Sequence, residues 1–283
     1  MNIQSIIVCG AGTMGRGIAE LTAARGIPTR LYDAAPAALE SARDQIMASW
    51  KNQLSKGRMS EADAARGRQC LTFVEAPGSP PADLIIEAIV ENLEAKVSLL
   101  RGLGTCMNSG TIIASNTSSL SIGALQNALP RPERVLGMHF FNPAPIMKLV
   151  EIVRGPMTDP DLVPALQALA VRLGKDPVVC NDAPGFIVNR VARPFYLESL
   201  RIVERGGGGM EDLDRIAEAT GFRMGPFRLM DLIGNDVNLA VTRSLYEAQG
   251  RPARLAPSPL QEEKVRTGNL GRKSGRGYYN YQN

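Results

Sequence analysis

The feature that most restricts the fold is a glycine pattern, residues 10–15 (GAGTMG), between a short apolar run and a helical stretch. Residues 5–9 have the apolar character of a buried strand, and residues 13–25 have the spacing of a helix. In this order the first glycine allows a tight turn, the second lets backbone approach a ligand, and the third lets helix and strand pack closely. The helix N-terminus favours anions, so the pattern predicts a dinucleotide site. The residues expected to contact the dinucleotide are Gly10, Gly12, Thr13, Met14 and Gly15.

An acidic residue follows where such a site needs one. Asp33 ends a second strand-like run, residues 29–33, about twenty residues after the glycines. A carboxylate there accepts hydrogen bonds from the adenosine ribose and repels a 2′-phosphate. No Arg or Lys follows closely, so NAD is favoured over NADP. The alternative is that Asp33 only caps the next helix.

Short apolar runs alternate with helical patterns through the first two thirds of the chain. They recur at residues 84–90, 111–114, 135–141, 147–153 and 177–180. Several do not alternate with polar residues, as expected of strands that are covered on both faces. The pattern predicts a Rossmann-type, doubly wound, mostly parallel sheet. Residues 36–56 and 60–69, separated by Gly57, predict a helical hairpin inserted into it.

After Pro184 the character of the chain changes. Helical patterns cover residues 186–204, 211–220, 229–248 and 259–267, and no strand-like run appears before the tail. We therefore expect two domains, a dinucleotide-binding domain at residues 1–183 and a smaller all-helical domain at residues 184–283.

Composition excludes several classes of protein. The net charge of +4 is not gathered into runs of Lys or Arg, which argues against nucleic-acid binding. The four cysteines are far apart without a CxxC pair, so we expect free thiols, a reducing compartment and no metal site. The sequence has neither a signal-like segment nor a run of eighteen apolar residues, so we expect a cytoplasmic protein that does not enter membranes.

Further segments resemble those of one family, the L-3-hydroxyacyl-CoA dehydrogenases. They are residues 87–92 (EAIVEN), 114–120 (ASNTSSL), 139–143 (HFFNP), 148–151 (KLVE), 184–190 (PGFIVNR), 224–226 (MGP) and the tail 271–279. The resemblance extends over essentially the whole chain. It implies NAD as cofactor, a 3-hydroxyacyl-CoA substrate, a Rossmann domain with a helical C-terminal domain, and a homodimer formed through the latter.

His139 is the only histidine, and oxidation of a secondary alcohol needs a base with a pKa near the working pH. By resemblance Glu151 is its partner, which would fix the imidazole tautomer and stabilise the imidazolium. If residues 142–145 formed a tight turn, His139 would face Lys148, and Glu151 would lie roughly 10 Å further along the strand. The pair therefore requires a wider connection, shaped by Pro143 and Pro145.

The resemblance gives roles to further residues. Ser118 would bond the substrate oxygen, although Ser118 or Ser119 could instead cap a helix. Asn189 would bond the C3 oxygen of the substrate. Asn116 and Asn142 would lie near the ribose or nicotinamide.

Two pairs of candidate residues have a purely structural role as the alternative. Glu91 and Lys96, after the run at residues 84–90, lie at the ligand edge of such a sheet, with a solvated structural role as the alternative. Lys56 and Arg58, at the tip of the predicted hairpin, could pair with CoA phosphates or be merely solvated.

Other functions are also open to comparison. A β-hydroxyacid dehydrogenase would have a Lys on the helix after Gly185, where residues 185–205 contain none. A related sugar-acid dehydrogenase is less similar around His139, because Phe140 and Phe141 resemble the acyl-CoA branch. A non-catalytic NAD-binding protein, like some lens crystallins, is disfavoured by the intact candidate residues. We expect a short substrate such as (S)-3-hydroxybutyryl-CoA, with 3-hydroxyadipyl-CoA as the alternative suggested by residues 221–226 and 231–234.

Overall fold

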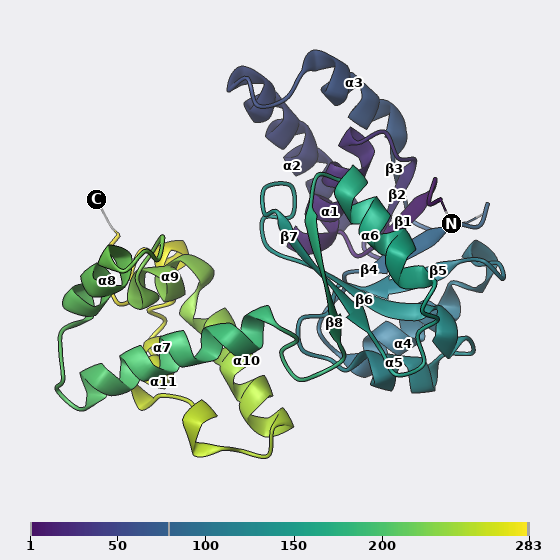
Figure 1. The fold of residues 1–283 in the computed structure, drawn as a ribbon. Coiled ribbons are helices and arrows are strands. Elements are labelled where there is room, and N and C mark those ends of the chain that lie inside the picture. Colours follow the sequence, from purple (N-terminus) through teal and green to yellow (C-terminus); the bar gives the residue numbers. More distant parts are fainter. Residues whose placement is uncertain (1, 79, 282–283) are drawn as a thin grey trace. The chain divides into compact units, whose positions relative to one another are not determined.

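The computed structural model describes residues 2–78 and 80–281, which form two compact units, Met1–Ala183 and Pro184–Asn283. The first unit contains a β-sheet with helices on both faces, and the second is helical (Figure 1). This is the predicted combination of a Rossmann-type sheet with an all-helical part, and the fold class is confirmed.

In the described residues the sheet has eight strands in the order β3-β2-β1-β4-β5-β6-β7-β8. Neighbouring strands are parallel except β6 and β7, which are antiparallel. The strand order reverses at β1, which lies between β2 and β4, and ligands bind at such a switch point. The strands are β1 Ile6–Cys9, β2 Thr29–Tyr32, β3 Leu71–Val74, β4 Leu84–Glu87, β5 Ile112–Ser115, β6 Val135–Phe140, β7 Leu149–Arg154 and β8 Asp176–Asn181.

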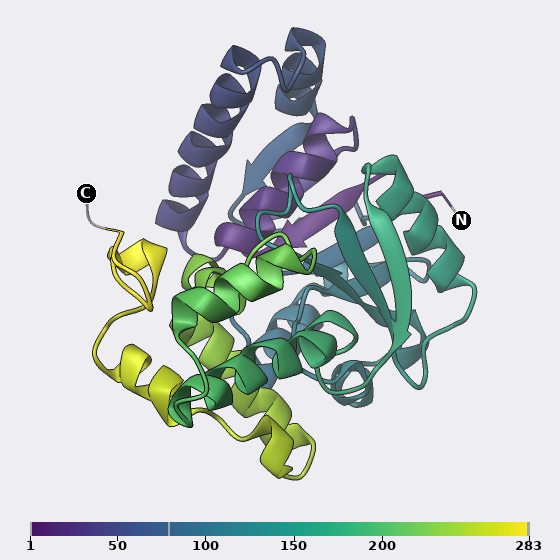
Figure 2. The ribbon, with the colours of Figure 1, turned by 60° about the vertical axis from the view of Figure 1, so that its left-hand side comes forward.

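The central strands β1, β4 and β5 are buried along their whole length, because helices cover both faces of the sheet. Helices α1 and α6 lie on one face, and α4 and α5 lie on the other (Figures 1 and 2). The helices of this unit are α1 Thr13–Ala24, α2 Pro36–Ser55, α3 Glu61–Cys70, α4 Leu93–Gly102, α5 Ile122–Ala128 and α6 Leu162–Arg172.

The predicted helical hairpin is confirmed as α2 and α3, which project beyond the sheet (Figure 1). The last two turns of α2 are fastened to α1, where the buried Glu20 accepts hydrogen bonds from Ser49 at 2.6 Å and from Gln53 at 2.9 Å. Within the hairpin, Gly67 lies against the indole of the buried Trp50, so closely that a Cβ there would be 2.8 Å from the ring.

Several predicted bounds were wrong. The run at residues 84–90 is a strand only as far as Glu87, because the chain turns there at the edge of the sheet. The strand β3 was not predicted. Residues 229–248 are not one helix: Gly234, with φ of 103°, separates α9 from α10. Only glycine adopts this backbone conformation easily.

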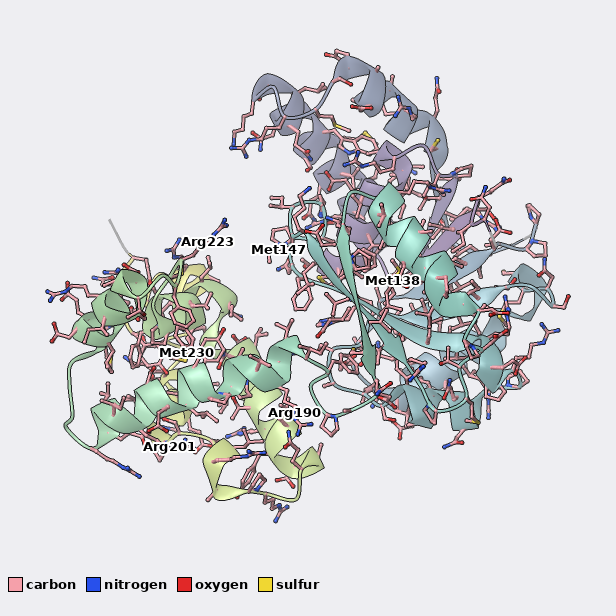
Figure 3. The ribbon with its side chains drawn as sticks, in the orientation of Figure 1. Met138, Met147, Arg190, Arg201, Arg223 and Met230 are labelled. Atoms are coloured by element: carbon pink, nitrogen blue, oxygen red, sulfur yellow. The ribbon has the colours of Figure 1, made fainter. Side chains whose placement is uncertain are left out.

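The second unit consists of α7 Val188–Glu204, α8 Met210–Ala219, α9 Pro226–Ile233, α10 Asn235–Ala248 and α11 Pro259–Arg266. Its core includes Leu200, Phe227 and Met230, and Met230 is labelled in Figure 3. Two buried carboxylates hold the tail. Asp231 accepts hydrogen bonds from the backbone N–H groups of Tyr278 and Tyr279. The Tyr279 hydroxyl donates to Asp214, which also accepts from the first turn of α9.

All four cysteines lie in the described part of the chain and are free thiols, as predicted; Cys70 is half-buried and the others are buried. No described helix combines the length and apolar character that crossing a membrane requires.

Gly15→Ala should destabilise the first unit by about 1–3 kcal/mol, because its methyl carbon would lie 1.8 Å from the carbonyl oxygen of Gly10. Gly12→Ala is the matched control, since a Cβ there meets nothing within 4 Å. Denaturant unfolding followed by circular dichroism would measure both. Equal stability of the two variants would contradict this account of the helix–strand packing.

Candidate active site

The glycine loop joins β1 to α1 with an open face. Gly10 has φ of 104°, and a Cβ there would lie 2.6 Å from the carbonyl oxygen of Ala88. Gly12 is different, because the space where its side chain would be is open to 4 Å. Gly12 is also the N-cap of α1, and among the described residues no side chain caps this helix N-terminus. Backbone N–H groups and the positive end of the helix dipole thus meet at an accessible surface, which fits the pyrophosphate of a dinucleotide. Thr13 and Met14 form the first turn of this helix.

Asp33 lies directly after β2, at the same edge of the sheet. One of its carboxylate oxygens accepts from the N–H of Ala11, inside the glycine loop, at 2.7 Å, and the other accepts from Ala35 at 2.9 Å. The structure therefore gives Asp33 a role that the sequence did not reveal, which is to hold the glycine loop. Carboxylate oxygens have several lone pairs, so these bonds leave capacity for ribose hydroxyls.

A buried ionic network lies at the ends of β4 and β5. Lys96, on α4, is 1% exposed, and its ammonium nitrogen is 2.6 Å from Glu87 and 3.2 Å from Glu91. Glu87 is fully buried and also accepts from the hydroxyl of Ser115 at 2.5 Å. Lys96 is thus an internal partner of two carboxylates, which links the loop after β4 to the start of α4.

Glu91 extends this network to the loop after β5. One of its oxygens accepts from the Thr117 hydroxyl at 2.6 Å and from the N–H groups of Ser118 at 2.9 Å and Ser119 at 3.0 Å. Burial opposes ionisation of Glu91, but the hydrogen bond from Thr117 and the charge of Lys96 outweigh it and lower the pKa of this carboxyl. Glu91 therefore fixes the loop that carries Ser118. Helix α5 is capped by Ser121, not by Ser118 or Ser119.

His139 and Glu151 form a buried pair. The antiparallel register of β6 and β7 places the two residues directly opposite each other, and His139 Nδ1 is 2.8 Å from Glu151 Oε2. His139 is 6% exposed and Glu151 is fully buried. A carboxylate at this distance favours the tautomer with the proton on Nδ1, which presents the lone pair of Nε2. The ring of Phe141 lies beside the imidazole, with centroids 4.5 Å apart.

The connection between these strands, residues 141–148, is wider than a tight turn, as the sequence predicted. Lys175, at the end of the α6–β8 loop, holds it from inside: its ammonium donates to the carbonyl oxygens of Ala144 at 2.6 Å and Met147 at 2.7 Å. Lys175 is 4% exposed, and burial, with the charges of Lys148 and Arg25, lowers its pKa to about 8. Ala144 is buried against Gly17 of α1.

The two predicted asparagines of this unit lie at the same edge. Asn116 follows β5, and its side-chain oxygen accepts from the N–H of Phe140 at 2.8 Å, next to His139. Asn142 is exposed in the connection after β6. The predicted residues brought together at the carboxyl edge of the parallel strands are Gly10, Gly12, Asp33, Glu91, Lys96, Asn116, Ser118 and His139, with Glu151 opposite.

Other predicted residues lie elsewhere. Lys56 and Arg58 are exposed at the α2–α3 turn. Asn189 belongs to the second unit, in the first turn of α7. The described residues contain no group of three or more His, Cys, Asp or Glu side chains that could hold a metal ion.

Sequence reasoning missed Glu87 and Lys175. Glu87 had a signal, a lone acid inside the apolar run at residues 84–90, which has to be paired when buried. No sequence signal pointed to Lys175, because a Lys that follows a glycine is normally on the surface.

Comparison with known proteins agrees with this arrangement. Residues 5–183 match the family model of the 3-hydroxyacyl-CoA dehydrogenase NAD-binding domain, and residues 185–281 match that of the 3-hydroxyacyl-CoA dehydrogenase C-terminal domain. A 3-hydroxyadipyl-CoA dehydrogenase of Escherichia coli is 43% identical over the whole chain, which spans 60% of that relative's length. A probable 3-hydroxybutyryl-CoA dehydrogenase of Bacillus subtilis is 38% identical, with 100% of this chain and 99% of the relative covered.

Solved structures show the same fold. An (S)-3-hydroxybutyryl-CoA dehydrogenase from Ralstonia eutropha superposes with a TM-score of 0.94 at 36% identity, with both chains covered completely. A crystal structure of an E. coli 3-hydroxybutyryl-CoA dehydrogenase gives 0.95 at 44% identity, covering 99% of this chain and 60% of the other. With both family models matched and full-length relatives found, the chain belongs to the 3-hydroxyacyl-CoA dehydrogenases, NAD-binding oxidoreductases that act on a CH–OH group.

Proposed function

We propose that this chain interconverts (S)-3-hydroxyacyl-CoA and 3-oxoacyl-CoA with NAD(H), with a short acyl chain such as 3-hydroxybutyryl as its first substrate. The observation that carries the proposal is the buried His139–Glu151 pair at the sheet edge that also bears the open glycine loop. When bound, NAD⁺ accepts the hydride from C3 of the substrate. A non-catalytic NAD-binding protein would have no need of a buried imidazole–carboxylate pair at this place.

In the proposed reaction His139 takes the hydroxyl proton on Nε2. Glu151, bonded to Nδ1, keeps the ring in the required tautomer and stabilises the imidazolium that forms. Ser118 would donate to the same substrate oxygen from a loop that Glu91 holds in place. Asn189 is proposed to bond the C3 oxygen as well, from the helical unit.

The proposed NAD contacts include the glycine loop and four further residues. Asp33 would bind the adenosine ribose, and Asn116 and Asn142 would lie near the nicotinamide or its ribose. Glu91 would face the cofactor beside the Ser118 loop, with Lys96 as its internal partner. Lys56 and Arg58 are proposed to attract CoA phosphates, which their exposure at the projecting hairpin supports.

Two acyl groups are candidates for the substrate. Relatives carry the names of 3-hydroxybutyryl-CoA and 3-hydroxyadipyl-CoA dehydrogenases. The second candidate is favoured by one observation, a buried arginine in the helical unit, Arg193. We also propose a cytoplasmic location, supported by the four free thiols.

We propose a homodimer formed through the helical unit. Leu232, Ile233 and Val237 on α9 and α10 are between 40% and 49% exposed, an apolar surface next to the unit's core. Leu229, also on α9, packs against the core of the unit and does not belong to this surface.

His139→Gln should reduce the oxidation of (S)-3-hydroxybutyryl-CoA by about 10²–10⁴, because the general base is lost. Glu151→Gln should cost a comparable factor, and the double variant should be scarcely worse than either single one, since the residues share one function. NADH formation measures the rates, and NAD affinity should stay near wild type. Single losses that multiply in the double variant would show that the residues act independently.

Asp33→Asn should raise the use of NADP relative to NAD, because it removes the charge that repels a 2′-phosphate but keeps an acceptor for the N–H of Ala11. Asp33→Ala, which also loses that acceptor, should bind both cofactors weakly. The ratio of kcat/KM for the two cofactors measures the effect. Equal efficiency of the unchanged protein with NAD and NADP would contradict the role of Asp33.

The chain should have twice its 30.4 kDa mass in light scattering at micromolar concentration. Val237→Asp should shift it to a monomer, because a charge in an apolar interface is left desolvated. Ile216→Asp is the control, at a residue of α8 that is 60% exposed outside this surface. A monomeric wild type, or a Val237→Asp variant that remains dimeric, would reject the interface.

A further inference from the structure

Arg193 is a buried cation without a carboxylate partner among the described residues. It lies on α7, is 3% exposed, and donates through Nη1 to the carbonyl and side-chain oxygens of Asn238, at 2.9 and 3.2 Å, and to Thr242 at 3.0 Å. Nε donates to the carbonyl of Asn189 at 3.3 Å, whereas Nη2 has no hydrogen-bond partner among those residues. Burial lowers the pKa of Arg193 to about 10, so it stays charged at neutral pH. Burying a charge without a counterion costs free energy, so the burial of Arg193 needs an explanation.

A second donor beside Arg193 also lacks a partner. Asn238 is 1% exposed, and its Oδ1 accepts from Arg193 and from Gln261 at 3.0 Å. Two donors at Oδ1 fix the orientation of this amide, so the other atom is the amide nitrogen, Nδ2, which is buried and has no partner among the described residues. The polar cluster of Arg193, Asn238, Thr242 and Gln261 thus contains two unused donors, the Nη2 group and Nδ2, and one unused acceptor, Oε1 of Gln261.

We propose that this cluster binds the terminal carboxylate of a dicarboxylic 3-hydroxyacyl-CoA, which makes Arg193 a specificity-determining residue. The inference rests on the proposed reaction and selects its second candidate substrate, the six-carbon dicarboxylic 3-hydroxyacyl-CoA, over the short monocarboxylic one. An anion supplied by the substrate would pair with the guanidinium and complete the hydrogen bonding of Asn238. Two unused donors on neighbouring side chains match in number the two oxygens of a carboxylate, whereas a phosphate group offers three acceptors.

The position on α7 fits a short dicarboxylic chain. Arg193 lies one helical turn after Asn189, about 6 Å along the axis. Asn189 is the residue proposed to bond the C3 oxygen. In a six-carbon diacid the terminal carboxylate carbon is three carbon–carbon bonds from C3, about 4 Å when extended. The two residues on one face of α7 can therefore bind the two ends of this segment.

The test compares kcat/KM for reduction of 3-oxoadipyl-CoA and acetoacetyl-CoA by NADH. The wild type should prefer 3-oxoadipyl-CoA. Arg193→Gln should lower the ratio of the two values by about 10- to 100-fold, mainly through KM, as expected when a charged hydrogen bond is lost. Asn238→Asp should lower it as well, because an internal carboxylate would pair with Arg193 in place of the substrate.

Arg201→Gln is the matched control. Arg201 projects from the same helix (Figure 3) and donates to the carbonyl oxygens of Ala253 and Arg254, so its loss tests general damage to the unit. It should leave the substrate ratio unchanged. If Arg193→Gln lowered both activities equally, or the wild type did not prefer the dicarboxylic substrate, the carboxylate site would be overturned. A wild type inactive with both substrates would instead refute the proposed function.

Discussion

The antiparallel pairing of β6 with β7 is the interaction on which the candidate site depends. Every other neighbouring pair of strands in the described part of the chain is parallel, so the side chains at the carboxyl ends of these strands meet at one edge. The reversal at β7 brings Glu151 back opposite His139, which a parallel crossover could not do with so short a connection. Lys175 then holds residues 141–148 through two backbone carbonyls, so the register does not rely on the turn alone.

Three buried cations serve this protein in different ways. Lys96 is paired with Glu87 and Glu91, so its charge is compensated inside the fold. Lys175 has only carbonyl oxygens as partners, and its environment favours the neutral form. Arg193 also lacks a carboxylate partner among the described residues, but its pKa stays far above neutrality. A missing counterion at a permanently charged group is the stronger indication of a ligand.

The Glu87–Lys96–Glu91 network contributes preorganisation. Removing Lys96 would leave the fully buried charge of Glu87 without a counterion, typically at a cost of about 3–5 kcal/mol. Through Glu91 the network fixes the Ser118 loop, and through Asn116 the end of β5 is tied to the strand of His139. The residues proposed to meet substrate and cofactor thus sit on a scaffold that is rigid before either binds.

The sequence by itself determined the fold class and the glycine loop, because these depend on local spacing, and it indicated His139 as the base because the chain has no other histidine. Glu151 was identified through the resemblance to a known family, and strand geometry then required a connection wider than a tight turn between the two residues. Only the tertiary structure decided the break at Gly234, the role of Asp33 in holding the glycine loop, and the partners of Glu87, Lys96, Lys175 and Arg193. These depend on contacts between residues distant along the chain, and whether a buried charge is compensated is a property of its neighbours in space.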